Sequence, residues 1–204
     1  MTHTPLIILA STSKPRKNAL KRLQLPFTTV APLINEDTLP NEDPISLVKR
    51  LAYEKAKAVA GSYPNALIIG GDQVAVINNQ AVGKPKDHKD AIEQLKQASG
   101  KSIVFHHGIC LLNAATKHIQ TDIESTTVTF RQLSTEKIKN YLLTEQPYNC
   151  AGSIMAESLG IALIERISTD DPHSLFGLPL LRLVKMLEKE GVDIIKKGNT
   201  YKDE

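Results

Sequence analysis

The stretch ALIIGGDQVAVINNQAVGKP, residues 66–85, places a lone carboxylate between two apolar runs. The first run, Ala66–Ile69, is long enough for a buried strand, and Val74–Ile77 is a second, β-branched run. The glycine pair Gly70–Gly71 allows another backbone or a ligand to come close. An ionised Asp72 at this place is unfavourable unless the carboxylate is paired with a cation or bound to a metal.

Two interpretations of this stretch stay open. In the plainer one, the two runs form a β-hairpin in which Asp72 caps a turn. In the other, Asp72, the two glycines and Lys84 bind a phosphate and its metal ion, because an acid, an open backbone and a cation lie within about a dozen residues. In both, Asn78–Asn79 is expected to form a turn.

Composition indicates a globular protein made of one large domain or two small lobes. The chain has 204 residues, of which 41% are hydrophobic and 23% charged, so a sizeable core can form. A net charge of +3 and 4% aromatic residues argue against a nucleic-acid partner. No apolar run approaches transmembrane length and no signal-peptide pattern is visible, so we expect a cytoplasmic protein without a membrane partner. Cys110 and Cys150 fit reduced thiols.

A polar, basic loop follows the first expected strand. Leu6–Ala10 is an apolar run typical of a buried strand, and apolar residues at helical spacing follow the loop after a proline. The loop Ser11–Lys17 therefore places hydroxyls and backbone N–H groups at a helix N-terminus, which is a natural anion site. Alternatively, Ser13 is a simple N-cap, and Arg16 and Lys17 belong to a solvated face.

The remaining segments alternate between strands and helices. Strands are expected at residues 27–31, 102–113, 119–130 and 161–167, and helices at 45–60, 89–98 and from 134 onwards. Residues 175–188 are expected to contain an entry at Gly177–Pro179 that leads into an apolar helix. An acidic, proline-rich loop at 32–44 contains Glu36, and a loose tail is expected at 191–204. Polar residues at 169–173 are interpreted as a loop, and His106, His107 and His118 as ordinary strand and loop histidines. This order predicts a mixed α/β sheet with flanking helices.

Standard catalytic motifs are absent from the sequence. It contains no GxSxG elbow, no Walker loop, no GxGxxG and no Cys/His zinc spacing. What remains is a scattered set with compatible chemistry, namely the Ser11–Lys17 loop, Glu36, Lys55, Asp72 and Lys84. Carboxylates can hold a divalent metal and a base position while cations hold phosphate oxygens, so the set suits attack of water on a polyphosphate. Spacing alone does not bring these residues together.

Nine segments resemble, in this order, the Maf family of nucleoside triphosphate pyrophosphatases. They read ASTSKPRKNALKRLQLPF, INED, LAYEKAKAVA, IIGGDQVAV, VGKP, SGKSIVF, FRQLS, CAGSIMAES and FGLPL. The resemblance extends from Leu6 to about Glu190. GGDQV with Gln73, CAGS and the acid Glu157 are similar to the 7-methyl-GTP pyrophosphatase branch, whereas the dTTP/UTP branch more usually has Asp-Thr-Val after the glycine.

The resemblance implies a fold and a reaction. It implies a single Maf/ITPase-like domain over residues 1–204, with an elongated mixed sheet and two lobes around a central cleft. The implied reaction hydrolyses the α–β phosphate bond of 7-methyl-GTP to 7-methyl-GMP and pyrophosphate, a nucleotide-pool house-cleaning activity. A divalent metal cation, Mg²⁺ or Mn²⁺, is implied as cofactor, and we expect a homodimer.

The resemblance also implies roles for individual residues. Asp72 matches the family's proton acceptor. The expected catalytic residues are Asp72, Lys84 and Glu36, the substrate-binding residues Ser11, Ser13, Arg16, Lys17 and Lys55, the metal ligands Glu36 and Asp72, and the specificity residues Pro15, Gln73 and Glu157. A carboxylate at Glu157 can accept from the N1–H and amino group of guanine, and the Gln73 amide can donate or accept.

Two features depart from the family pattern. The loop that usually reads SPxRR or SPRR has its proline one position later here, and Lys17 replaces the second arginine, which keeps the charge but loses bidentate geometry. At Pro15 this branch often carries an aromatic, and proline cannot supply a cation–π contact to a methylated base. A pyrophosphatase for dTTP, UTP or another modified nucleotide is therefore an alternative. A nucleotide-binding regulator of septum formation is another.

Overall fold

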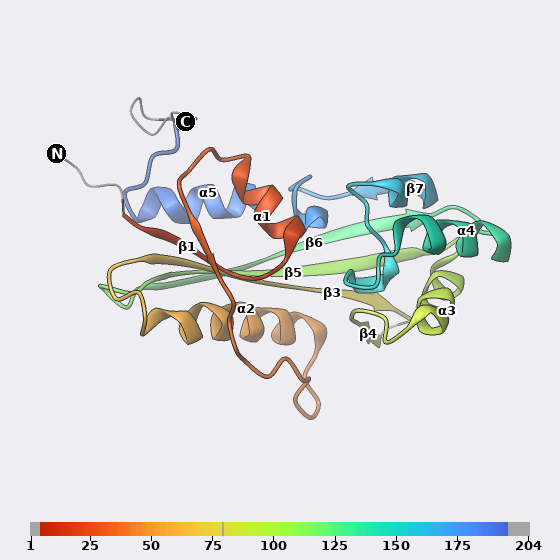
Figure 1. Ribbon diagram of the computed structural model, residues 1–204, viewed down its shortest axis with the longest axis horizontal. Helices are drawn as coiled ribbons and strands as arrows, with labels where there is room; N and C mark the ends of the chain where they lie inside the picture. Colours follow the sequence, from red (N-terminus) through yellow and green to blue (C-terminus); the bar gives the residue numbers. More distant parts are fainter. Residues whose placement is uncertain (1–4, 79, 196–204) are drawn as a thin grey trace.

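A computed structural model describes residues 5–78 and 80–195 (Figure 1). Its strands are β1 (Ile7–Ala10), β2 (Thr28–Val30), β3 (Leu67–Ile77), β4 (Gln80–Val82), β5 (Ser102–Asn113), β6 (Ile119–Phe130) and β7 (Ile164–Ser168). Its α-helices are α1 (Lys14–Lys21), α2 (Pro44–Ala60), α3 (His88–Ala98), α4 (Thr135–Glu145) and α5 (Leu180–Lys189). Short 3-10 helices are η1 (Ala151–Ser153), η2 (Leu159–Leu163) and η3 (Ser174–Phe176).

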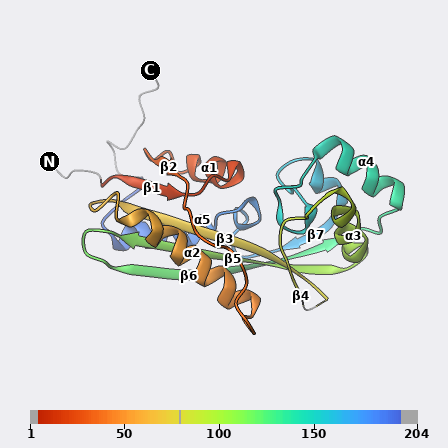
Figure 2. The same ribbon diagram turned by 60° about the horizontal axis from the view of Figure 1, so that its bottom comes forward.

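All of these strands belong to one elongated mixed sheet. Their order is β2-β1-β3-β5-β6-β7, and β4 pairs with β3. β1 runs parallel to β2 and β3, whereas the pairs among β3, β5, β6 and β7 are antiparallel. Helices flank the sheet at both ends of the molecule (Figures 1 and 2). The predicted mixed α/β fold is confirmed.

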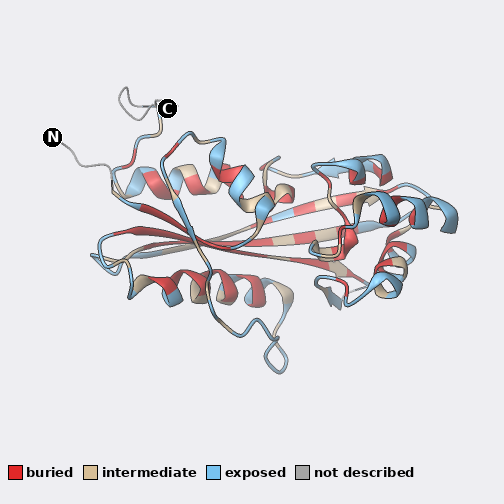
Figure 3. Ribbon diagram, viewed as in Figure 1, coloured by how far each residue is buried: buried red, intermediate tan, exposed pale blue. Residues whose placement is uncertain are grey.

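The core of the protein consists of separate apolar clusters along the sheet (Figure 3). At one end, α1 and α5 cover one face and α2 the other. At the opposite end, α3 and α4 enclose a cluster that contains Phe105 and Val128. None of the described helices is both long and apolar enough to cross a lipid bilayer.

The strand β3 corrects the hairpin interpretation of Asp72. β3 runs without interruption from Leu67 to Ile77 and pairs with β5 from Leu67 to Val76, with Asp72 opposite Gly108. The chain turns only after β3, where Asn78 has a φ of 50° and β4 begins two residues later. The other half of the predicted turn, residue 79, lies outside the described residues. Asp72 therefore lies in the middle of a buried strand.

Two glycines allow α2 to lie directly against the sheet. A Cβ at Gly70 would lie 2.0 Å from the carbonyl oxygen of Ala52, and one at Gly108 would lie 2.1 Å from that of Val48. Any side chain at these positions would therefore collide with the backbone of α2. This close approach is a reason for glycine inside a strand, and it brings the inner face of α2 next to Asp72.

One predicted strand boundary was wrong near the C-terminus. The strand expected from residue 161 begins at Ile164, because residues 159–163 form η2 and Ile161 is 54% exposed. The helix expected after the Gly177–Pro179 entry begins at Leu180, as predicted, and Gly177, with a φ of 99°, ends η3. Of the tail predicted to be loose, residues 196–204 lie outside the described residues, and the two-lobe domain division stays a prediction.

We expect the substitution Gly108→Ala to lower the free energy of unfolding by about 1–3 kcal/mol, the usual range for overpacking a core. The added Cβ would meet the backbone of α2, which no side-chain rotation can relieve. Chemical unfolding in urea measures the change. The matched control is Gly61→Ala at the end of the same helix, where the backbone is αR and no atom lies within 4 Å. Equal stability of the two variants would contradict the close approach of α2.

Candidate active site

One edge of β3 is open in the middle of the strand. β1 pairs with residues 67–69 and β4 with residues 75–77, whereas β5 covers the other edge from residue 67 to 76. In the described chain no strand therefore lies beside residues 70–74 on that edge. A cleft of about 940 Å³ opens at this gap. Ser11, directly after the carboxyl end of β1, also lines it, and such crevices are common binding sites in α/β sheets.

The open edge gives the cleft access to side chains from both faces of the sheet. Successive side chains of a strand point to opposite faces. Asp72 faces α2, as do Gly70 and Gly108, whereas Gln73 lies on the face of Gly71. Both Asp72 and Gln73 nevertheless line the cleft.

Lys55 joins two carboxylates at the cleft. Its Nζ atom lies 2.7 Å from Asp72 Oδ1 and 2.8 Å from Glu36 Oε2. Lys55 is 4% exposed and Asp72 8%, so both charges of this pair are largely removed from water. A buried carboxylate and ammonium are tolerated only in such a pair. The single ammonium group also offsets repulsion between the two acids.

Glu36 projects into the cleft from the loop between β2 and α2, and its side chain is 51% exposed. Partial burial raises its pKa, but the hydrogen bond from Lys55 and the charges of Lys55, Lys84 and Arg16 outweigh burial and lower the pKa below its ordinary value. Glu36 is therefore ionised at neutral pH. The effect also shows that Lys84 and Arg16 act at the same place.

The loop before α1 is organised by its own hydroxyl groups. Ser13 is the N-cap of α1, and its Oγ accepts a hydrogen bond from the backbone N–H of Arg16 over 3.4 Å. Ser11 Oγ accepts from the backbone N–H of Ser13 over 3.1 Å. The N-cap interpretation is confirmed, and both serines also line the cleft. The two hydroxyl protons stay available to a ligand, since each of these bonds uses the oxygen as acceptor.

Arg16 is held by the segment between β7 and α5. Its Nε donates to the carbonyl oxygen of Gly177 over 3.1 Å, while its terminal nitrogens have no partner among the described residues. A Cβ at Gly71 would lie 3.4 Å from Arg16 Nε, so the side chain of Arg16 crosses β3 at Gly71, and Arg16 lines the cleft. Gly177 was predicted only as part of a helix entry. The signal that could have pointed to its contact with the site was the FGLPL segment, one of those that resemble the family.

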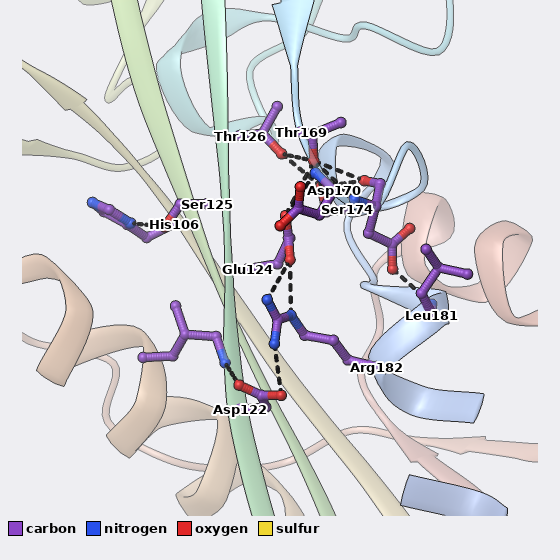
Figure 4. Close-up of polar contacts among 12 residues, drawn as sticks. His106, Asp122, Glu124, Ser125, Thr126, Thr169, Asp170, Ser174, Leu181 and Arg182 are labelled. Atoms are coloured by element: carbon purple, nitrogen blue, oxygen red, sulfur yellow. Dashed lines mark hydrogen bonds and ion pairs between the residues drawn. The ribbon is translucent and has the colours of Figure 1, made fainter. Parts of the chain in front are cut away.

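A network of buried polar groups fixes that segment (Figure 4). Asp171 is 1% exposed and accepts from the backbone N–H groups of Leu181, over 2.7 Å, and His173, over 2.9 Å. Its carboxylate thus satisfies a free donor in the first turn of α5. Ser174 Oγ lies 2.6 Å from Thr126 Oγ1 and donates to the carbonyl of Asp171.

Glu124 on β6 ties the same segment to α5. Its carboxylate accepts from Arg182 Nε over 2.8 Å and from the hydroxyl of Thr169 over 3.2 Å. Arg182 also donates to Asp122 over 2.7 Å (Figure 4). The sequence predicted a polar loop at residues 169–173, but Thr169 and Asp171 point inward and fix the segment that carries the carbonyl of Gly177.

The opposite wall of the cleft comes from the segments that contain Lys84 and Glu157. The backbone N–H of Gly152, in η1, donates to the carbonyl of Gly83 over 3.1 Å and joins these segments. Burial, and then the charge of Glu145, raises the pKa of Glu157. Burial raises the pKa of Cys150 to about 11, with smaller effects of Glu157 and Glu145, so this cysteine is a thiol at neutral pH.

The structure brings together all but one of the residues expected in the site. Those that line the cleft are Ser11, Ser13, Pro15, Arg16, Glu36, Lys55, Asp72, Gln73, Lys84 and Glu157. Lys17 is exposed on α1 and does not line it. Lys14, which was not predicted, also lines the cleft. The hydroxyls and cations around the Asp72–Glu36 pair suit a polyanionic ligand.

The donor set fits a hard divalent cation bound together with a ligand. Asp72 and Glu36 are the carboxylates that face each other across Lys55. No group of three or more His, Cys, Asp or Glu side chains within residues 5–78 and 80–195 could hold a metal unaided. Mg²⁺ is commonly held by one or two carboxylates together with substrate phosphates, and the two acids here match that pattern.

Comparison with known proteins is consistent with this geometry. A protein of Nitrosococcus oceani named 7-methyl-GTP pyrophosphatase is 50% identical over 191 residues, which are 94% of this chain and 96% of that protein. One of Methylobacillus flagellatus with the same name is 49% identical over 191 residues, covering 94% of this chain and all of its own.

A solved structure shares the fold at much lower sequence identity. The Staphylococcus aureus Ham1 protein superposes with a TM-score of 0.52 at 15% identity, over 90% of this chain and 98% of its own. The sequence pattern of the family described as Maf-like protein matches residues 6–190. This chain belongs to the Maf family.

Proposed function

We propose that the protein is a nucleoside triphosphate pyrophosphatase that hydrolyses 7-methyl-GTP to 7-methyl-GMP and pyrophosphate. The observation that carries the proposal is the buried Lys55 between Asp72 and Glu36, at a cleft that also contains Arg16 and Lys84. The names of relatives at about half identity support this substrate. The proposed role is to remove a modified nucleotide from the free pool.

Asp72 is the proton acceptor in this proposal. Lys55 donates to Oδ1, and no hydrogen bond to Oδ2 is found in the described residues. Oδ2 can therefore accept a proton from a water molecule in the cleft. The water oxygen then bonds to the α phosphorus. The bond between the α phosphorus and the α–β bridging oxygen breaks, and pyrophosphate leaves with that oxygen and the electron pair.

Arg16 and Lys84 stabilise the charge that develops on the phosphate oxygens. Arg16 is positioned by Gly177 and keeps its terminal nitrogens free, so little reorganisation is needed when the anion binds. Ser11 and Ser13 donate to phosphate through their hydroxyl groups. Lys17 lies outside the cleft and adds only long-range positive potential.

A divalent cation, Mg²⁺ or Mn²⁺, is part of the proposal. Asp72 and Glu36 would hold it, and the lowered pKa of Glu36 keeps that ligand ionised. When bound, such an ion neutralises phosphate charge and polarises the reacting phosphoryl oxygens. Lys55 holds the two acids in place beside it.

The base is read by Gln73 and Glu157, with Pro15 beside them on the cleft. The Glu157 carboxylate accepts from the N1–H and amino group of guanine. Pro15 offers no ring face for the positive charge of a methylated base, so recognition depends on these hydrogen bonds. A cytoplasmic location agrees with a free nucleotide as substrate, and the homodimer stays a prediction.

The main test is a panel of nucleoside triphosphates assayed for pyrophosphate release. We expect 7-methyl-GTP to be the best substrate in the presence of Mg²⁺ or Mn²⁺, and expect chelation by EDTA to stop the reaction. Preference for dTTP or UTP would replace the substrate assignment. If no triphosphate in the panel releases pyrophosphate, the result would contradict the pyrophosphatase activity and support the nucleotide-binding regulator.

We expect Asp72→Asn to lower kcat by at least about a hundredfold, the contribution typical of a general base. The fold should persist, because Lys55 keeps its bond to Glu36, and thermal unfolding checks this. The matched control is Asp37→Asn, an exposed acid next to Glu36 that does not line the cleft. Unchanged pyrophosphate release by Asp72→Asn would remove Asp72 from the catalytic role.

We expect Glu157→Ala to lower the ratio of kcat/KM for 7-methyl-GTP to that for UTP by about tenfold or more. Hydrogen bonds to a charged group contribute about 1.5–3 kcal/mol, and 1.4 kcal/mol corresponds to a factor of ten. Glu136→Ala is the control, because Glu136 is an exposed acid in the first turn of α4. If the ratio stays the same in Glu157→Ala, this residue does not read the base.

A further inference from the structure

His107 on β5 is buried without any hydrogen bond. It is 0% exposed, and both ring nitrogens lack a partner. Buried polar groups are almost always satisfied, and leaving one unsatisfied is destabilising. A residue with two such atoms therefore calls for a specific explanation, which its place in the sequence did not provide.

The imidazole of His107 is neutral. Burial, and then the nearby charges of Arg16 and His106, lowers its pKa to about 3. A neutral imidazole carries one N–H donor and one acceptor nitrogen. His107 can thus serve as a hydrogen-bonding group at any pH at which the protein works.

A side chain with unused hydrogen-bonding capacity lies directly opposite His107. Gln73 on β3 is its register partner, and the Cβ atoms of such cross-strand pairs are about 4.5–5.5 Å apart on the same face. The Gln73 side chain is half-buried, lines the cleft, and makes no hydrogen bond within the described residues. This spacing places the Gln73 amide and the imidazole within possible reach of each other.

The other polar neighbours of His107 are less suited to accept its N–H. Glu124 is its register partner on β6, but its carboxylate accepts from Arg182 and Thr169 (Figure 4). Arg16 keeps terminal nitrogens without a partner in the described chain, but a guanidinium group has only donors. Among these groups, Gln73 is the one that combines a free acceptor with access to the cleft.

We propose that His107 is a positioning residue for base recognition: its N–H donates to Gln73 Oε1 and fixes the Gln73 NH₂ group toward the nucleotide. The proposal rests on the proposed function, in which Glu157 accepts from the N1–H and amino group of guanine. The NH₂ group of Gln73 then donates to O6, the acceptor that remains on that edge of the base.

Fixing the amide is what makes Gln73 selective. A free glutamine amide can exchange its oxygen and NH₂ by rotation, so it can satisfy either the O6 of guanine or the 6-amino group of adenine. With Oε1 held by His107, only the donor faces the cleft. An adenine amino group would then meet another donor, and a buried polar pair without an acceptor is strongly disfavoured.

The test measures binding at equilibrium with non-hydrolysable α,β-methylene analogues of 7-methyl-GTP and 7-methyl-ATP, by calorimetry. We expect the wild-type protein to prefer the guanine analogue, and His107→Leu to reduce the ratio of the two dissociation constants by about tenfold. His107→Gln, which keeps a donor, should retain most of the preference. Thermal unfolding checks that both His107 variants stay folded.

Two further variants separate positioning from simple packing. In a Gln73→Leu background, His107→Leu should change the ratio no further, because His107 acts through Gln73. The matched control is His106→Leu. The wild-type His106 side chain forms a hydrogen bond with Ser125 on the other face of the sheet (Figure 4). This substitution should leave the ratio unchanged.

The outcomes separate this inference from the proposed function. A ratio that stays within twofold in His107→Leu overturns it, as does an equal loss with and without Gln73. Absence of a guanine preference in the wild-type protein also overturns it, even if pyrophosphate is released. If the ratios change as expected but no pyrophosphate is released, the inference stands and the pyrophosphatase activity fails.

Discussion

The ammonium group of Lys55 is the constraint on which the site depends. It holds Asp72 on the central strand and Glu36 on a loop at hydrogen-bonding distance, and it makes a carboxylate tolerable inside a buried strand. Lys55 can reach Asp72 only because α2 lies against the bare backbone at Gly70 and Gly108. The glycines of the sheet thus allow the close approach of α2, and Lys55 on that helix holds the acidic loop and Asp72 together.

The interrupted edge of β3 explains how one cleft combines two kinds of chemistry. Asp72 and Gln73 are neighbours in sequence but belong to opposite faces of the sheet. If another strand paired with β3 at this point, the two side chains would face separate spaces on the two sides of the sheet. Beside the gap between β1 and β4 they face one ligand, so the reacting phosphates and the base can be contacted by adjacent residues.

The sequence was sufficient wherever periodicity reflects burial. β5 and β6 have their predicted bounds, and α2 begins one residue early, because long runs record which face is covered. The hairpin interpretation of Asp72 was wrong because a Gly-Gly-Asp sequence between apolar runs is compatible with a turn as well as with a strand. Family resemblance collected the site residues, but not the Lys55 bridge. The unpaired ring of His107 could not be predicted, because hydrogen-bond satisfaction depends on neighbours from other strands.

The long strands also constrain how the molecule can move. β3, β5 and β6 each run the length of the sheet without interruption (Figure 2). Among the described residues, the two ends of the sheet are thus joined by paired strands and not by a hinge of the kind that links two domains. Narrowing of the cleft must come from bending of a hydrogen-bonded sheet or from its surrounding loops. The loop that carries Glu36 is tethered to α2 through Lys55. A ligand that displaces this loop would therefore also change the contacts of the ammonium group that pairs with Asp72.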